Sequence, residues 1–216
     1  MTRSQIALVL HALALIGALV VLVPRLTAIN GPSGFLLSLA FHWIAFCIPV
    51  IAIHVWNRDG GQTFSERLAW RDWFVPILLL VQVGMVFLAA LVPYTALLTT
   101  HGAMLAAAVA VFNGPLMEAS WRGGFLTAFH NRPSLGFALA YLLGTASCLP
   151  FALSQNLNFP GGWPMLLAGV ALPGLLWSWI AWRTGSVFYS SIAHVLTNIL
   201  SFWVLFNANG FVTPHP

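Results

Sequence analysis

The sequence predicts an all-α membrane protein, a polytopic bundle of about seven transmembrane helices. Apolar residues make up 60% of its 216 positions and charged residues only 6%, whereas about a quarter of the residues in soluble domains are charged. Apolar runs long enough to cross a bilayer follow one another along the chain, and none shows the alternation typical of a strand. We therefore expect a single membrane domain over residues 1–216, in contact with membrane lipids.

The predicted spans lie between segments rich in Gly, Pro and Asn, such as Asn30-Gly31-Pro32 and Asp59-Gly60-Gly61. The first run is longer than a signal-peptide core of roughly 7 to 15 residues, and Pro24-Arg25 follows where small residues would mark a cleavage site. It is therefore expected to remain as a span. Residues 1–100 are expected to form three peripheral spans, and residues 101–207 a core of four. The spans are predicted at residues 5–23, 35–56, 73–98, 102–130, 134–154, 163–182 and 186–207.

The arginines predict the orientation of the bundle. If the spans alternate in direction, only Arg25 falls on one side of the membrane, and six other arginines outside the spans fall on the opposite side. The positive-inside rule then places the N-terminus in the cytoplasm, as in a bacterial inner-membrane protein. The largest cytoplasmic loop is expected to include a short interfacial helix over Phe64 to Trp73. The six arginines are Arg3, Arg58, Arg67, Arg71, Arg132 and Arg183.

Composition argues against several other functions. The net charge of +4 comes without a basic stripe that would bind nucleic acid. Cys47 and Cys148 lack metal-ligand spacing, so neither a zinc cluster nor a disulfide framework is expected. Histidines in the first two spans raise the possibility of a pigment or haem ligand, but His42 and His54 lie roughly 120° apart around a helix. We expect no metal and no cofactor, while a transporter or a pigment-binding subunit remains a further alternative.

The fourth predicted span carries the main polar anomaly, a carboxylate and a guanidinium inside an apolar sequence. Glu118 and Arg122 are four residues apart and therefore share a helix face. An ionisable residue at bilayer depth costs roughly 2.5 to 3.5 kcal/mol, so such residues persist mainly as partners or in sites. Asn113-Gly114-Pro115 interrupts the same span, which is tolerated where the backbone is buried or faces a wet cavity. The pair is either a structural ion pair or part of a site.

Two further helices present polar groups at helical spacing. The fifth span ends with Ser147, Phe151 and Gln155 at successive steps of four, and the seventh carries His194 and Asn198. Three spans thus offer polar faces that can meet inside one bundle. Straight helices would place these groups at different depths in the membrane. Glu118 would lie roughly 21 Å and Gln155 roughly 32 Å from the cytoplasmic ends of their spans.

The order and spacing of these groups resemble the CAAX protease and bacteriocin-processing enzyme family of intramembrane proteases. The family pattern is Glu-Glu-x-x-x-Arg, Phe-x-x-x-His and His-x-x-x-Asn or Asp on three core helices. The chain reads Met117-Glu118-x-x-x-Arg122, Phe151-x-x-x-Gln155 and His194-x-x-x-Asn198, so that Met117 and Gln155 replace two expected catalytic groups. The resemblance covers residues 116 to 202 and implies a carboxylate, aided by His, that activates water against an amide.

The departures from the pattern indicate a degenerate active site. Met takes no proton, and Gln does not titrate near neutral pH. The resemblance then implies a cavity that accepts a transmembrane helix or a lipidated peptide. We expect this cavity to be lined by Met117, Phe151, Gln155 and Ser147. The protein itself would act as an assembly or scaffold partner in a larger membrane complex. The alternative is an active glutamic-type endopeptidase that uses Glu118, Arg122, His194 and Asn198. In either case we expect Arg122 to contact Glu118 or the His194 helix.

Overall fold

The computed structural model describes residues 1–56, 62–66 and 68–212. Its described residues form helices and turns without a strand, and seven helical segments are long and apolar enough to cross a membrane. The predicted all-α fold and the number of spans are therefore confirmed. Arg58, Arg67 and the Asp59-Gly60-Gly61 turn lie outside the described residues. The seven segments are Arg3–Ile29, Gly31–Trp56, Trp70–Leu97, Thr100–Ala128, Pro133–Leu153, Gly162–Thr184 and Phe188–Ala208.

Three segments are single helices, namely α1 (Arg3–Ile29), α9 (Gly162–Thr184) and α10 (Phe188–Ala208). The other four change helix type along their length. The second consists of α2 (Gly31–His42), η1 (Trp43–Cys47), α3 (Ile48–Val50) and η2 (Ile51–Trp56). The third consists of η3 (Trp70–Asp72), α5 (Val75–Val86), η4 (Phe87–Leu91) and η5 (Val92–Leu97). The fourth consists of α6 (Thr100–Met117), η6 (Glu118–Gly124) and α7 (Phe125–Ala128), and the fifth of α8 (Pro133–Ala146) and η7 (Leu149–Leu153).

The predicted interfacial helix over Phe64 to Trp73 is wrong. Among the described residues from Phe64 to Trp73, only η3 (Trp70–Asp72) is helical, as a 3₁₀ turn. The loop is held instead by hydrogen bonds to the start of α10, because the Thr63 carbonyl accepts from the Val187 N–H at 2.7 Å and from the Ser186 hydroxyl at 3.2 Å. Tertiary contacts therefore decide the conformation of this segment.

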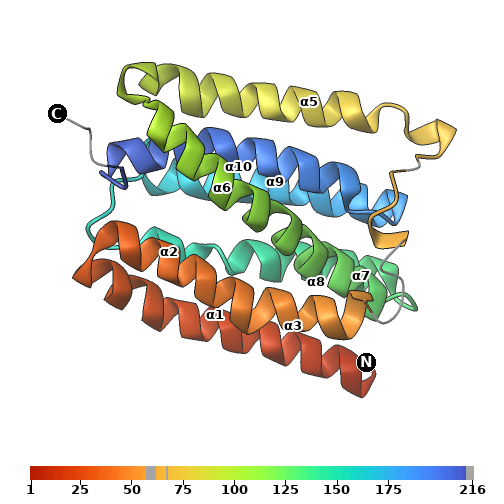
Figure 1. Cartoon of the computed structure of the whole chain (residues 1–216). Helices are drawn as coiled ribbons and strands as arrows, with labels where there is room; N and C mark the ends of the chain where they lie inside the picture. The colour runs from red at the N-terminus through yellow and green to blue at the C-terminus, as the bar shows by residue number, and fades with distance from the viewer. Residues whose placement is uncertain (57–61, 67, 213–216) are drawn as a thin grey trace.

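The first two spans form a tight antiparallel hairpin because Asn30 serves both helices. Its N–H donates to the Leu26 carbonyl at the end of α1, and its side chain accepts from the Ser33 N–H in the first turn of α2. A Cβ atom on Gly34 would overlap the backbone of Leu26, so a glycine allows the close approach of the two helices. Figure 1 shows this hairpin along one edge of the bundle and α5 along the opposite edge.

Helix α6 crosses the bundle diagonally and packs along α10, with α8 and α9 beside them (Figure 1). The start of α1 and the end of α10 lie at opposite ends of the bundle. The buried core includes Phe46, Trp121, Phe125 and Phe129, whose rings stack in series. Trp121 donates to His42 Nε2 at 3.2 Å, so one histidine of the second span serves as a hydrogen-bond partner in the core. These contacts place the fourth span at the centre of the fold.

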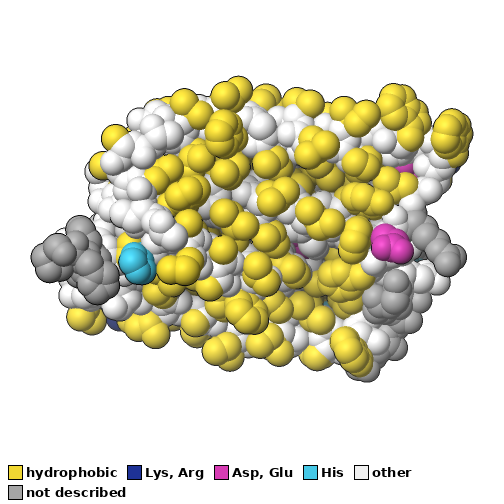
Figure 2. Space-filling view, turned by 45° about the horizontal axis from the view of Figure 1, so that its top comes forward, with side chains coloured by type: hydrophobic (Ala, Val, Ile, Leu, Met, Phe, Trp, Pro, Cys, Tyr) yellow, Lys and Arg dark blue, Asp and Glu magenta, His cyan; other side chains and the backbone are white. Residues whose placement is uncertain are grey.

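The outer surface is suited to lipid. Apolar side chains cover the face shown in Figure 2, and the acidic side chains visible there lie towards one end of the molecule. Large hydrophobic residues point outward along the spans, with exposed fractions of 66% for Leu80 and 70% for Leu172. Such a surface is stable in a bilayer but not in water. The chain is therefore an integral membrane protein in contact with lipid.

Candidate functional site

The polar site lies where the fourth span changes from an α-helix to a π-helix. Pro115 lies inside α6, and the wider turns of η6 begin three residues later at Glu118. The Glu118 N–H is shared between the carbonyls of Gly114 and Pro115, as expected where the hydrogen-bond ladder changes register. Every residue of η6 is buried. The predicted interruption at Gly114-Pro115 thus leads directly into a buried segment that carries both ionisable groups.

Glu118 joins two neighbouring elements through a single carboxylate oxygen. Its Oε1 accepts from Arg122 Nη1 at 2.9 Å, as the spacing of four predicted, and lies 2.9 Å from His194 Nδ1. A carboxylate oxygen only accepts, so the histidine ring donates in this contact. The side chain is fully buried, and its Oε2 has no hydrogen-bond partner. The carboxylate therefore connects η6 to α10 at the centre of the bundle.

Arg122 connects the same segment to α9. Its Nε donates to the Ser178 hydroxyl at 3.2 Å, and its Nη2 donates to the Gly174 carbonyl at 3.4 Å. A Cβ atom on Gly174 would lie 3.3 Å from Nη2, so the absence of a side chain there gives the guanidinium its room. Each of the three guanidinium nitrogens of Arg122 therefore donates a hydrogen bond to another residue of the protein.

The histidine ring is fixed by contacts that the sequence reasoning did not find. Trp177 of α9 stacks on His194, with ring centroids 4.3 Å apart, and donates from its Nε1 to Gln82 Oε1 at 3.2 Å. The Gln82 amide in turn donates to the Thr197 hydroxyl at 3.1 Å. Gln82 is the only polar side chain in α5, a signal that was available in the sequence. This bridge holds α5, α9 and α10 together around the histidine.

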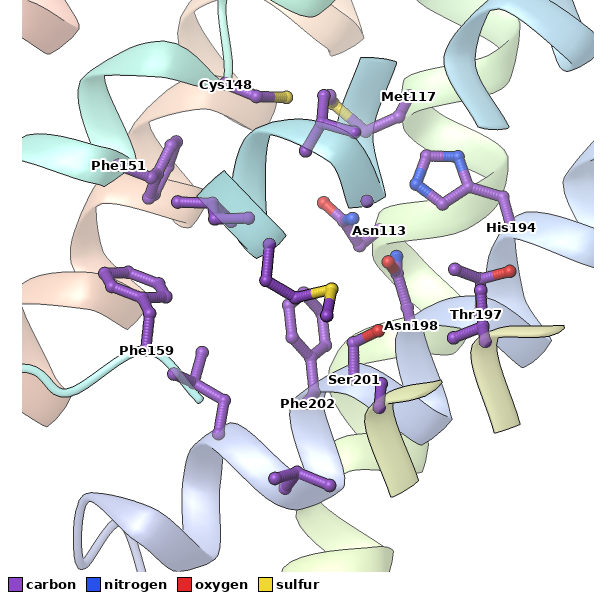
Figure 3. Close-up of a pocket in the computed structure, with 18 of the residues that line it drawn as sticks. Asn113, Met117, Cys148, Phe151, Phe159, His194, Thr197, Asn198, Ser201 and Phe202 are labelled. Atoms are coloured by element: carbon purple, nitrogen blue, oxygen red, sulfur yellow. The ribbon is translucent and has the colours of Figure 1, made fainter. Parts of the chain in front are cut away.

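Next to these groups lies a cavity of about 270 Å³. Figure 3 shows Asn113, His194, Thr197, Asn198 and Ser201 together on one side of it, with Phe151 and Phe159 on the other. Most of the wall is apolar. Polar groups from α6 and α10 therefore face an apolar wall, built by residues of α2, α9 and η7. The apolar wall includes Phe35, Leu39, Phe151, Met165, Leu166 and Val170.

Five of the predicted site residues line this cavity, namely Met117, Arg122, Phe151, His194 and Asn198. Glu118 does not line it, because its carboxylate lies behind the wall against Arg122 and His194. The structure thus brings the ion pair and the His194 helix together, as predicted. It also places Met117, the residue at the position of the first family glutamate, at the cavity surface.

Gln155 and Ser147 do not line the cavity, contrary to the prediction. Gln155 is exposed, and its N–H donates to Thr27 Oγ1 at 2.8 Å, beside the end of α1. The Ser147 hydroxyl is buried against the Gly144 carbonyl at 2.7 Å. The prediction failed because α8 ends at Ala146, so a spacing of four does not keep residues on one face across the 3₁₀ turn that follows.

Thr145 takes the place on the fifth span that was predicted for Gln155. It lines the cavity, and its buried Oγ1 has no hydrogen-bond partner. A Cβ atom on Gly174 would contact both this hydroxyl and Arg122, so the two side chains lie close together. Tyr141 precedes Thr145 by four residues, which repeats the spacing of an aromatic and a polar residue within a regular helix. That spacing was the available signal.

Metal ligands do not gather at this site. In residues 1–56, 62–66 and 68–212, no three His, Cys, Asp or Glu side chains come together as a metal ion would require. Cys47 Sγ contacts Met117 Sδ at 3.9 Å behind the cavity wall. His11 and His42 of the first two spans make hydrogen bonds to Ala45 and Trp121. The polar groups that line the cavity include amides, hydroxyls, the Cys148 thiol, the imidazoles of His42 and His194 and the guanidinium of Arg122.

The fold and the site define a class, a polytopic membrane protein with a Glu, Arg and His cluster beside an intramembrane cavity. Residues 99–200 match the model of a family described as type II CAAX prenyl endopeptidase Rce1-like. The match covers just under half of the chain, and over these residues the chain is similar to the CAAX protease and bacteriocin-processing enzyme family. The matched region contains Glu118, Thr145 and His194. No curated protein and no solved structure matches the chain.

Proposed function

We propose that the protein is a catalytically degenerate member of its family that binds an apolar chain in its cavity and acts as an assembly or scaffold partner in a membrane complex. The observation that carries this proposal is the position of Glu118. The carboxylate lies outside the cavity, and one of its oxygens is shared by Arg122 and His194, each at 2.9 Å. It serves as the centre of a structural network.

Met117, Thr145 and Asn198, which line the cavity, are poorly suited to activate water. A general base needs an accessible lone pair and a proton affinity matched to the operating pH. Met117 has no proton-accepting group of useful strength, and Thr145 and Asn198 exchange hydrogen bonds without titrating near neutral pH. His194 donates from its Nδ1 to Glu118 and stacks on Trp177, and neither contact uses its Nε2. These side chains are suited to holding a ligand by hydrogen bonds.

A glutamic-type endopeptidase is the second candidate. The 2.9 Å contact between Glu118 and His194 matches the carboxylate and histidine partnership expected of an active member, and Glu118 Oε2 has no protein partner. A water molecule held at Oε2 would be the nucleophile, with the Asn198 amide as a donor to the oxyanion. This reading requires the cavity wall to open next to Glu118.

A cleavage assay decides between the two functions. The purified protein is reconstituted in liposomes with a fluorogenic farnesylated peptide, next to an active family member as the positive control. We expect wild type to cleave no faster than Glu118→Gln or the Glu118→Gln/His194→Ala double variant. Turnover by wild type that Glu118→Gln abolishes would establish the endopeptidase and refute the degenerate site.

The scaffold role predicts a stable partner. Extraction of the native protein from its membrane in a mild detergent, followed by native mass spectrometry, should give a mass well above that of one chain. Fractionation should place the complex in the bacterial inner membrane. Recovery of the bare chain alone, at detergent concentrations that keep a known membrane complex intact, would contradict this role.

A further inference from the structure

Two hydrogen-bonding atoms at the cavity have no partner in the protein. They are Asn198 Nδ2 and Thr145 Oγ1, both buried and both on residues that line the cavity. Asn198 as a whole is only 8% exposed, and Figure 3 shows its amide among the polar side chains of the cavity. Each buried polar atom without a partner costs about 1–3 kcal/mol. A ligand with oxygen acceptors would remove that cost.

The charges at the site indicate that the polar end of the ligand is neutral. Arg122 is the one arginine or lysine among the described residues of the cavity wall, and its nitrogens already bind Glu118, Ser178 and Gly174. A carboxylate or phosphate would bring a second negative charge next to Glu118 without a free cation to neutralise it. Uncharged carbonyl oxygens match the available donors without this penalty.

The cavity is long and mostly apolar. Its wall extends along α10 from His194 to Leu205, about 16 Å at 1.5 Å per residue. The polar side chains of Asn113, His194 and Asn198 lie together on one side of it. An extended apolar chain with a small polar head matches this lining.

The depth of Asn198 in the membrane further limits which head groups a ligand can carry. Asn198 lies ten residues from each end of α10 (Phe188–Ala208), and therefore about 15 Å from either end of that span. A phospholipid whose ester reached this level would carry its charged phosphate into the bilayer core, which is strongly unfavourable. A neutral lipid with a carbonyl head resides at this depth without such a charge.

We propose that the cavity binds an isoprenoid quinone, with ring carbonyls that accept from Asn198 and Thr145 and a tail along the apolar wall. The flat ring matches the aromatic lining, which includes Phe151 and Phe202, and the quinone has a carbonyl at each end of its ring. This inference rests on the proposed function, since it treats the cavity as a binding site. It concerns binding alone.

Direct binding tests the proposal. The protein is purified in nanodiscs, its extracted lipids are analysed by mass spectrometry for quinones, and decylubiquinone is titrated against tryptophan fluorescence. We expect quinone in the extract, saturable quenching by decylubiquinone, and about three- to tenfold weaker binding in each of Asn198→Leu and Thr145→Val, because each removes one donor. Asn207→Leu is the matched control, an asparagine of α10 outside the cavity wall. It should bind like wild type.

Competing ligands separate the possible failures. Monoolein offers an acyl ester, and the farnesylated peptide offers an isoprenoid on a thioether. The quinone site is supported if neither monoolein nor the farnesylated peptide displaces decylubiquinone, and if Asn207→Leu binds decylubiquinone as tightly as wild type. Absence of saturable quinone binding, or equal affinity in wild type and Asn198→Leu, would overturn it. If no variant cleaves peptide in that case, the degenerate function still stands, whereas peptide cleavage that depends on Glu118 would overturn the proposed function itself.

Discussion

Replacement of Arg122 by Met should destabilise the protein more than any other single arginine substitution. The change keeps an unbranched side chain of similar length and removes only the charge and its donors. Glu118, at 0% exposure, is then left with His194 as its single partner. Breaking a buried ion pair from one side costs about 3–5 kcal/mol, because the remaining charge has no compensation. Glu118→Gln should cost a similar amount through the stranded guanidinium.

The double variant Glu118→Gln/Arg122→Met gives the sharper measurement. With both charges removed, the desolvation penalty disappears as well, so the double variant should lose only about 0–2 kcal/mol. The coupling energy from the double-mutant cycle should therefore be roughly 3 kcal/mol or more, which is typical only of residues in direct contact. Unfolding in mixed micelles of increasing denaturing detergent, followed by circular dichroism, supplies the four free energies.

Arg183→Met is the control for this cycle. Arg183 also pairs with a buried carboxylate, since its Nε lies 2.6 Å from Asp72 Oδ1, but its own side chain is 34% exposed and Arg71 remains near Asp72. Its loss should cost about 1 kcal/mol or less. The reasoning fails if Arg122→Met costs no more than Arg183→Met, or if the two single effects add up to the effect of the double variant.

Three further predictions concern the bridge, the hairpin and the orientation. Gln82→Leu should cost about 1–3 kcal/mol in thermal unfolding, because Trp177 and Thr197 each lose a buried partner; an unchanged melting curve would contradict a bridging role. Gly34→Ala should cost about 1–3 kcal/mol by overlap with the Leu26 backbone, whereas Gly17→Ala, with open space around it, should be neutral or stabilising by up to about 1 kcal/mol. Alkaline phosphatase fused after Ala208 should be active in bacteria, because seven spans together with the cytoplasmic N-terminus that the arginines predict would place that end outside. If the phosphatase fusion is inactive and a fluorescent protein fused at the same site is bright, that end lies in the cytoplasm and the predicted orientation is wrong.

The spans and the ion pair were accessible to sequence reasoning because both depend on local chemistry. A bilayer demands a minimum length of apolar helix, and the predicted spans consequently overlap all seven observed ones, with ends that differ by a few residues. The predicted 5–23 run extends to Arg3–Ile29, since the capping box at Thr2 and the cap at Asn30 lengthen α1 beyond its apolar centre. Glu118 and Arg122 met as predicted because their spacing of four operates within one helix.

The sequence pattern did not identify which polar residue of the fifth span lines the cavity. Gln155 and Thr145 both follow an aromatic residue by four positions, so the pattern alone favoured neither. Only the end of α8 at Ala146 separates them, because it leaves Thr145 on the regular helix that faces the cavity and carries Gln155 to the surface beside Thr27. Helix α8 ends at Ala146 because Pro150, four residues later, has no N–H for the Ala146 carbonyl and its ring crowds that carbonyl, so a 3₁₀ turn follows.

The sequence by itself determined an all-helical bundle of seven spans with one charged pair in the fourth, because hydrophobicity and helical period act over neighbouring residues. The tertiary structure alone decided that Glu118 turns away from the cavity, that Gln82 and Trp177 fix His194, and that Asn198 and Thr145 face an apolar cavity without partners. These outcomes join α5, η6, α8, α9 and α10 across long stretches of sequence. They arise from the packing of the helices against one another, which sets the rotation and depth of each.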